Sequence, residues 1–146
     1  MNTWLKIALG FFFIGILAAA LVYKFYINKP HPDIEKLPAD FKLNAEVLYK
    51  EYVKEKAAAN LKYNGKIIEI SGQLSKIESA DTIVVATYVF NQGDFGDEGI
   101  RCTMLPKYNE EIKKITSGTE VSIKGLCSGF NDTDVIIEKS SLIKNK

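Results

Sequence analysis

The chain has 146 residues, of which 47% are hydrophobic and 25% are charged, and its formal net charge is +1. The length suits one domain of roughly 100–150 residues with an accessory segment, and the composition excludes a disordered chain. A nucleic-acid-binding domain usually carries a clear basic excess. The balance of 19 basic and 18 acidic residues therefore argues against that class.

An uncharged apolar run fills residues 7–23 near the N-terminus, between Lys6 and Lys24. We predict a transmembrane helix over residues 4–27, because a helix of that length is about 36 Å long and a hydrocarbon core is about 30 Å thick. The alternative is a cleaved signal peptide, with Lys6 ahead of the apolar stretch and the alanines at 18–20 as its cleavage region.

Residues 28–43 hold three of the four prolines and few apolar side chains. Proline fixes its own φ and disfavours helix in the residue before it, so we predict a semi-stiff linker here. The only histidine, His31, lies between two of these prolines, and we interpret it as a solvated residue. Histidine-based catalysis or metal binding is therefore not expected.

The folded domain is predicted to span residues 44–143 and to begin with a helix over residues 44–59. Asn44 is a favourable N-cap residue, apolar residues follow at spacings of three and four, and three alanines favour helix. Asn64 and Gly65 come shortly afterwards, and both tolerate the positive φ with which many helices end.

Five strands are predicted after this helix, at residues 66–74, 82–90, 100–105, 121–128 and 134–138. Apolar and polar residues alternate in the first of them, which is typical of a half-buried strand. A short helix is predicted over residues 107–115, between the third and fourth strands. The stretch at 91–99 is rich in glycine and acidic residues, and we interpret it as a long, solvated loop.

Two of the predicted strands share a pattern in which a glycine follows an inward isoleucine after two positions: Gly72 after Ile70, and Gly125 after Ile123. An inward glycine often marks a bulge or a sharp bend, so both strands are expected to coil there, as a small closed barrel requires. Five strands with a helix between the third and fourth have the order of an OB-fold.

The predicted fold is therefore mainly β. It is a five-stranded OB-fold Greek-key barrel with a preceding helix and a short helix between its third and fourth strands, plus one N-terminal transmembrane helix. The competing architecture is an open β-sandwich fragment, which a helical insertion between strands makes a poorer fit.

Three short motifs give the chain a resemblance to the bacterial tRNA_anti-like OB-fold family. They are A-N-L-K-Y-N-G-K at residues 59–66, the I-x-G pattern ending at Gly72, and G-x-C-x-G from Gly125 to Gly129. The similarity covers roughly residues 44–143. It implies an OB-fold, and it implies nucleic-acid binding only by analogy, because one fold hosts many functions. Similar members often carry an N-terminal signal or membrane anchor.

Two cysteines, Cys102 and Cys127, fall on inward rows of the third and fourth strands. An even count in an exported domain suggests a disulfide. However, an OB barrel places the fifth strand between these two, so a pair of free buried thiols is the other interpretation. The carboxylates of Asp94, Asp97 and Glu98 have the oxygen ligands that suit Ca²⁺, but their spacing does not match an EF-hand loop. We predict no metal site and no cofactor.

The sequence contains no recognised catalytic motif, and enzyme activity is not expected. OB-folds bind ligands on their second and third strands, through aromatic and basic side chains. Tyr88 and Phe90 share one row of the second strand, which we expect to face inward. The candidate ligand-binding residues are then Phe95, Arg101, Thr103, Lys107 and Tyr108.

We expect a non-catalytic binding or scaffolding module that is anchored in the bacterial inner membrane, with its domain outside the cytoplasm and an envelope protein or glycan as partner. The N-terminus resembles a signal-anchor, which favours export, whereas four lysines in the 19 residues after the apolar run favour a cytoplasmic domain. In that second orientation the alternative function is single-stranded nucleic-acid binding.

Overall fold

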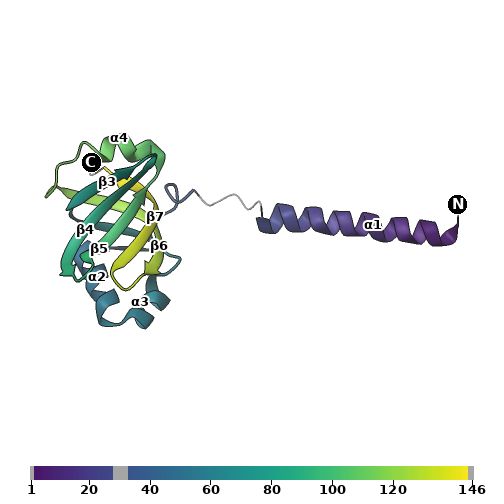
Figure 1. Cartoon of the computed structure of the whole chain (residues 1–146), viewed down its shortest axis with the longest axis horizontal. Coiled ribbons are helices and arrows are strands. Elements are labelled where there is room, and N and C mark those ends of the chain that lie inside the picture. Colours follow the sequence, from purple (N-terminus) through teal and green to yellow (C-terminus); the bar gives the residue numbers. More distant parts are fainter. Residues whose placement is uncertain (1, 28–32, 145–146) are drawn as a thin grey trace. The chain divides into compact units, whose positions relative to one another are not determined.

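The computed structural model describes residues 2–27 and 33–144, and it divides into two compact units, the second of which begins at Asp33 (Figure 1). The first unit contains helix α1 (Thr3–Val22), which continues into a short π-helical stretch, η1 (Tyr23–Ile27). The stretch Thr3–Phe25 has a mean hydropathy of 2.4 in its most apolar window, with none of that window buried. The predicted N-terminal apolar helix is thus present and is long enough to cross a membrane. His31 lies outside the described residues.

The second unit is built on one sheet of seven strands in the order β1-β2-β6-β7-β5-β4-β3. Their bounds are Phe41–Asn44 (β1), Ile67–Gln73 (β2), Lys76–Ala80 (β3), Ile83–Gly93 (β4), Gly96–Met104 (β5), Glu120–Phe130 (β6) and Asp134–Ile143 (β7). The pairs β1–β2 and β5–β7 are parallel, and the other neighbours are antiparallel. The mainly β prediction is confirmed.

The sheet has seven strands where the sequence predicts five. All five predicted strands are present, as β2, β4, β5, β6 and β7, and the additional ones are β1 and β3. Only Leu74 and Ser75 separate β2 from β3, yet β2 pairs with β6 while β3 pairs with β4. One continuous stretch of chain therefore pairs with strands that are far apart in the strand order. The sheet has to curl to bring these strands to the two ends of that stretch.

The stretch at residues 91–99, predicted as a loop, is instead a hairpin. Strands β4 and β5 remain paired out to Gly93 and Gly96, and only Asp94 and Phe95 form the turn. Gly96 has a φ of +121°, a backbone conformation that residues with a side chain rarely adopt. Polar composition suggested a loop, but polar side chains that hydrogen-bond across the two strands support pairing equally well.

The second half of the predicted linker is also part of the folded unit. Ile34 is only 4% exposed, and the backbone amide of Asp40 donates to the carbonyl of Ile67 over 2.7 Å. The amide of Ile67 donates in turn to the Asp40 carboxylate over 2.8 Å, and β1 follows directly. Residues 33–40, which we call the docked segment, therefore lie against the domain. Ile34 is a single apolar residue among prolines and charged residues, so the local sequence offers little signal for this contact.

Lys124 on β6 holds the docked segment through its ammonium group. This group donates to the backbone carbonyls of Glu35 and Leu37, over 2.8 Å in each case, and Lys124 is only 9% exposed. A nearly buried ammonium group needs such partners, because an unpaired one would lose its hydration without replacement. The contact thus fixes the chain just before β1.

The predicted helix at 44–59 is two helices, α2 (Ala45–Lys54) and α3 (Lys56–Tyr63), which break at Glu55, where φ is −152° and ψ is 79°. The Asn44 side chain accepts a hydrogen bond from the amide of Glu46, which confirms the predicted N-cap. The predicted helix at 107–115 is shorter, with a 3-10 turn η2 (Pro106–Tyr108) followed by α4 (Asn109–Ile112). In Figure 1, α2 and α3 lie at one end of the sheet and α4 at the other.

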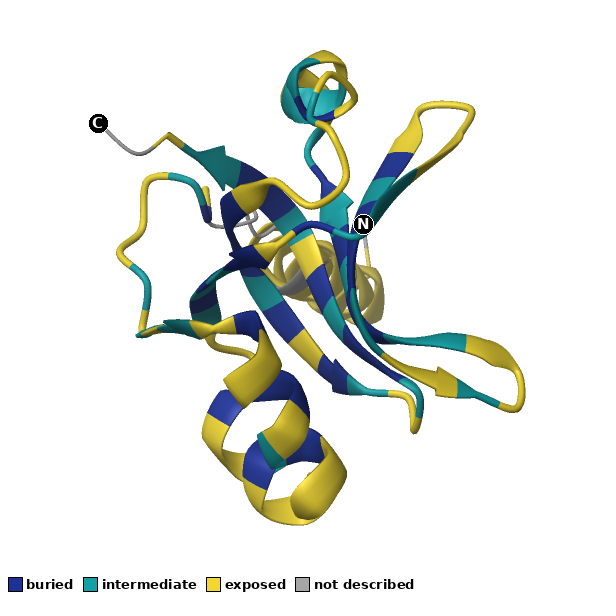
Figure 2. Cartoon of the chain, turned by 90° about the vertical axis from the view of Figure 1, so that its left-hand side faces the viewer, coloured by how far each residue is buried: buried dark blue, intermediate teal, exposed yellow. Residues whose placement is uncertain are grey.

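The core lies inside the curled sheet and continues beneath α2 and α3. Along the strands, buried residues alternate with more exposed ones, as Figure 2 shows. Tyr88 is fully buried within the sheet, and its hydroxyl donates to the Val121 carbonyl over 3.0 Å. Tyr52 from α2 is also fully buried, with its hydroxyl 3.3 Å from the sulfur of Cys127. Buried tyrosines thus satisfy their polar ends inside the core.

The two glycines of the shared sequence pattern have different roles. A Cβ atom on Gly125 would lie 2.6 Å from Ile137 Cγ2 and 2.8 Å from the backbone oxygen of Glu138, and the β6–β7 register shifts beside it. A Cβ atom on Gly72 would come no closer than 3.4 Å to another atom, and the β2–β6 register is regular there. A register shift is therefore found beside Gly125 and not beside Gly72, whereas the chain leaves β2 for β3 directly after the residue that follows Gly72.

Candidate binding face on strands β3, β4 and β5

The outward side chains of β3, β4 and β5 form one face, which we call the β3–β5 face. Its centre is the outer row of β4, where Ile83 is exposed, Val85 and Val89 are half-buried, and Thr87 is buried. In register, Lys76 of β3 and Arg101 of β5 stand on either side of Thr87. The face is thus a β-branched stripe bordered by charged side chains.

The two cations of this face are each held between two carboxylates. Lys76 lies 2.9 Å from Asp97 and 3.3 Å from Glu78, and Arg101 lies 2.9 Å from both Glu78 and Asp134. The hydrogen bond to Asp97 raises the pKa of Lys76. Burial acts to lower the pKa of Arg101, but Asp134 and Glu78 outweigh it, and the pKa is raised. Both cations therefore stay charged and already have partners.

Asp134 at the start of β7 is the anchor of this network. It is 5% exposed, and its carboxylate accepts from the backbone amide of Gly99 over 3.0 Å as well as from Arg101. A buried carboxylate with two such donors is fixed in position. It therefore holds the Arg101 side chain in place through the hydrogen bond from Arg101 Nε.

Thr87 lies beneath these charged side chains. It is 1% exposed, and its hydroxyl finds no hydrogen-bond partner among the described residues. A buried hydroxyl without a partner costs about 1–3 kcal/mol. The position is thus polar in sequence but behaves as part of the apolar stripe.

The structure brings together only part of the predicted ligand-binding set. Arg101 and Thr103 are two positions apart on β5 and lie on the β3–β5 face. Phe95 lies at the tip of the β4–β5 hairpin and is 98% exposed. Lys107 and Tyr108 lie in η2, and both bind the carboxylate of Glu35 in the docked segment. Two of the five candidates thus serve to hold the chain itself.

The Glu35 contact also sets the ionisation of the groups around it. The hydrogen bonds from Lys107 and then Tyr108 lower the pKa of the Glu35 carboxyl. Burial, together with the hydrogen bond to Glu35, raises the pKa of Tyr108 to about 12. At neutral pH, Glu35 is therefore charged, and Tyr108 is neutral and able to donate.

Sequence reasoning missed three charged residues of the face: Lys76, Glu78 and Asp134. The alternation of Lys76 and Glu78 with Ile77 was an available signal for β3, since charged residues two apart share one side of a strand. The position of Asp134 beside Arg101 depends on the parallel β5–β7 pairing, which alternation alone does not reveal.

The aromatic residues of β4 point inward, as predicted. Tyr88 is fully buried, and the ring of Phe90 lies 5.5 Å from that of Tyr49 in α2, centroid to centroid. Of residues 76–104, all of which the structure describes, Phe95 is the only aromatic residue outside this inward row. The β3–β5 face therefore offers no ring on which a base could stack.

Cys102 and Cys127 are both fully buried, and both are free thiols. Each pairs in register with Ile137, so strand β7 stands between them. Two strand spacings of about 4.8 Å exceed the Cα separation of about 4.4–6.8 Å that a disulfide needs. Burial raises the pKa of the Cys102 thiol. Within residues 2–27 and 33–144, no group of three His, Cys, Asp or Glu residues is placed to hold a metal ion.

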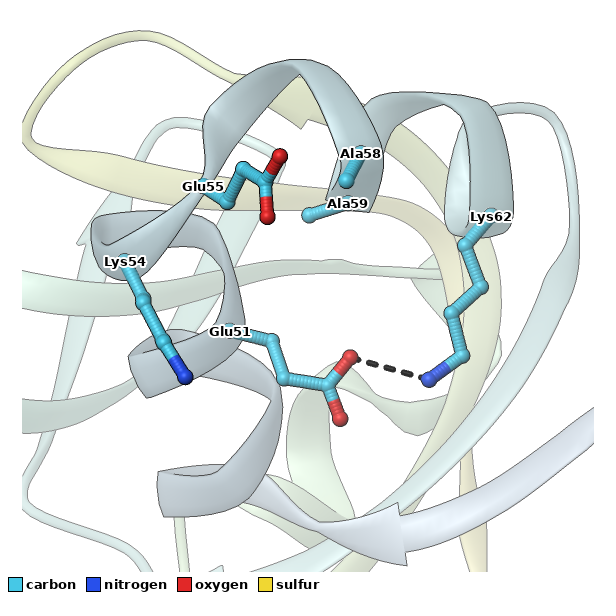
Figure 3. A pocket seen from close by; sticks show the side chains of 6 residues that line it. All are labelled: Glu51, Lys54, Glu55, Ala58, Ala59 and Lys62. Atoms are coloured by element: carbon cyan, nitrogen blue, oxygen red, sulfur yellow. Dashed lines mark hydrogen bonds and ion pairs between the residues drawn. The ribbon is translucent and has the colours of Figure 1, made fainter.

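Two concave regions lie away from the centre of the face. Figure 3 shows a pocket of ≈ 220 Å³ between α2 and α3, lined by Glu51, Lys54, Glu55, Ala58, Ala59 and Lys62. An ion pair of 2.9 Å between Glu51 and Lys62 closes one side of it. A more polar groove of ≈ 460 Å³ borders the hairpin and is lined by Asn44, Glu46, Gly72, Gln73, Ser75, Val89, Phe90 and Glu120. Only this second groove shares a residue, Val89, with the β3–β5 face.

The chain belongs to the tRNA_anti-like family, whose model matches residues 1–142. Among solved structures, it resembles a lipoprotein from Klebsiella pneumoniae that is proposed to bind nucleic acid. The TM-score is 0.53 at 17% identity, over 80% of this chain and 100% of the lipoprotein. At that identity the likeness shows a shared fold.

Two weaker structural matches are the mitochondrial single-stranded DNA-binding protein Rim1 of S. cerevisiae and the Stn1–Ten1 complex of S. pombe. Rim1 matches with a TM-score of 0.35 at 14% identity, over 55% of this chain and 95% of Rim1. The S. pombe chain matches with a TM-score of 0.36 at 14% identity, over 54% of this chain and 59% of its own length. A search of curated proteins found no match.

Proposed function

We propose that the chain is a single-pass, membrane-anchored OB-fold module that binds an envelope protein or glycan without catalysing a reaction. In this assignment, β2 and β3 are the two halves of one bent first strand, and β4, β5, β6 and β7 complete a five-stranded barrel. The two-residue link between β2 and β3 and their separate pairings with β6 and β4 support it. A long first strand that pairs on both sides is one way to close a small barrel.

The proposed ligand surface is the β3–β5 face, because β4 and β5 are then the second and third barrel strands, where OB-folds bind their ligands. The net charge of this region is the observation on which the proposed class of ligand rests. Residues 76–104 contain two basic and five acidic side chains, a net charge of −3. Both basic groups are already paired with carboxylates. A phosphate backbone would be repelled here, whereas a protein or glycan with basic groups would not.

The absence of an outward ring on the face supports the same choice. Proteins that bind single strands combine a basic groove with aromatic stacking platforms, and each stacked base contributes about 1–3 kcal/mol. The β3–β5 face supplies neither feature. Nucleic-acid binding by the Klebsiella lipoprotein, if it extends to this chain, would need another surface.

In the orientation that we propose, α1 spans the bacterial inner membrane and the folded domain lies outside the cytoplasm. Lys6 stands ahead of the uncharged apolar run of α1, as a basic residue does in a signal-anchor, and this pattern supports export. A periplasm-dependent reporter enzyme fused after Lys146 would test it. An active reporter is expected, whereas a silent but expressed reporter would place the domain in the cytoplasm.

Binding to mixed-sequence single strands tests the choice of ligand. We expect the full chain in detergent to show no binding to a fluorescent 20-nucleotide DNA or RNA at low salt, where electrostatic binding is strongest. Binding that weakens steeply between 50 and 200 mM salt, on the order of a thousandfold, would overturn the proposal. The matched variant Glu78→Lys tests the reason, because it removes an acidic group from the face and should create weak, salt-sensitive binding.

A further inference from the structure

The β4–β5 hairpin ends in an exposed aromatic residue that has no evident role in the fold. Phe95 is 98% exposed, which makes it the most exposed large apolar residue in the described part of the folded unit. Leu61 on α3 comes next, at 89%. Large aromatic side chains dominate the energetics of protein interfaces, so a ring held this far from the core is a candidate contact residue.

The hairpin that carries Phe95 is braced on both strands. Asn91 donates to Glu98 over 2.7 Å, and Gln92 donates to Asp97 across the same pair of strands. Further contacts tie the hairpin to neighbouring elements. Tyr49 of α2 donates to Glu98 over 3.3 Å, and Lys76 of β3 lies 2.9 Å from Asp97. A braced hairpin presents its tip in one conformation, which lowers the entropy lost on binding.

The surroundings of Phe95 are acidic. Asp94, Asp97 and Glu98 lie within three residues of it, and Lys76 is the one cation paired with them among the described residues. An anionic membrane surface would repel this tip, so insertion into lipid is disfavoured. A protein surface that offers an apolar pocket with basic groups at its rim would match both the ring and the charge.

We propose that Phe95 is the anchor of a docking site on the hairpin tip, for a partner protein with an apolar pocket bordered by Lys or Arg. The inference rests on the proposed function and narrows it to a protein ligand and one contact residue. Asp94, Asp97 and Glu98 steer the basic rim of the partner, and the Phe95 ring fills its pocket.

The first experiment places the photoreactive amino acid benzoylphenylalanine in the full chain in its native cells. It replaces Phe95 at the tip, Val85 on the β3–β5 face or Leu61 on α3, one position per variant. We expect one discrete protein adduct from position 95 and none from position 61, which is equally apolar and nearly as exposed. Adducts made mainly of lipid, nuclease-sensitive adducts, or equal yields at positions 95 and 61 would overturn the inference.

The second experiment uses the cross-linked protein after purification, titrated against the full chain in detergent. Phe95→Ala is expected to weaken binding about thirtyfold, as the loss of a hot-spot aromatic does. Leu61→Ala should leave binding unchanged. Asp94→Lys should weaken binding and reduce its salt dependence. Since Phe95 and Asp94 are exposed, unchanged melting temperatures will show that the variants are folded.

The outcomes separate this inference from the proposed function. Adducts from position 85 with none from position 95 would refute the hairpin anchor and leave the β3–β5 face as the ligand surface. The absence of adducts from both positions would count against both proposals. Undiminished binding of the purified partner to Phe95→Ala would refute the anchor even if an adduct forms.

Discussion

Replacement of Gly125 by alanine is the most direct test of the packing described above. The added methyl group would lie 2.6 Å from Ile137 Cγ2, 2.7 Å from Ser140 Oγ and 2.8 Å from the backbone oxygen of Glu138. Non-bonded carbon and oxygen atoms stay more than 3 Å apart, and a backbone carbonyl in a paired strand cannot move freely to restore that separation. Overpacking of a core costs about 1–3 kcal/mol, and three simultaneous clashes suggest the upper end, about 3 kcal/mol.

Gly72→Ala is the matched control, because the same sequence pattern contains both glycines. Its methyl group would meet Ala45 Cβ at 3.4 Å and the Tyr88 ring at 3.6 Å, which are ordinary contacts. Alanine also restricts the unfolded chain, so this variant should be unchanged or more stable by about 0.5 kcal/mol. The two glycines, alike in sequence, should therefore differ by roughly 3 kcal/mol.

Thermal unfolding of the full chain in detergent, followed by near-ultraviolet circular dichroism of the buried tyrosines, would measure the difference. A loss of about 3 kcal/mol corresponds to a melting temperature lower by roughly 12 °C for a domain of this size. If Gly125→Ala melts within 2 °C of the parent, or Gly72→Ala loses as much as Gly125→Ala, the assignment of the β6–β7 irregularity to Gly125 is wrong.

Three further predictions concern the β3–β5 face and the cysteines. Thr87→Val should raise the free energy of unfolding by up to about 1 kcal/mol, because it removes a buried hydroxyl without a partner, and a loss above 1 kcal/mol would show that the hydroxyl is bonded. Asp134→Ala should lower the free energy of unfolding in urea by about 2 kcal/mol. The loss is smaller than for a fully buried pair because Arg101 is partly exposed, and an unchanged value would mean that the pair is dispensable. Cys102 and Cys127 should both resist iodoacetamide at pH 8 in the folded chain. After unfolding without reductant, mass spectrometry should find two labels, whereas no label would indicate a disulfide.

The sequence predicted well those elements whose signal is local. The inward row of Ile68 and Ile70 and the burial of Tyr88 follow from alternation, which reports burial directly along a strand. The break between α2 and α3 at Glu55 was missed because neither glycine nor proline marks it. Strand β1 was missed for a different reason, since Phe41 finds its partner Ile68 some 27 positions later and nothing nearby announces the pairing.

The candidate site shows the same limit. The outward position of Arg101 follows from strand alternation, and the structure agrees. Lys107 and Tyr108 were chosen because basic and aromatic residues suit a ligand, but Glu35, more than 70 positions away, binds both. Composition identifies groups able to make contacts, whereas only the tertiary fold shows which contacts the chain itself has already made.

The docked segment also constrains how the length of this chain can vary. Asp40 is bonded to Ile67, and Phe41 stands opposite Ile68, so removal of one residue between Ile34 and Asp40 would shift β1 by one position. Such a shift would turn Phe41 and Leu43 away from the domain, because side chains alternate along a strand. Insertions and deletions in relatives of this chain should therefore fall before the docked segment and spare it.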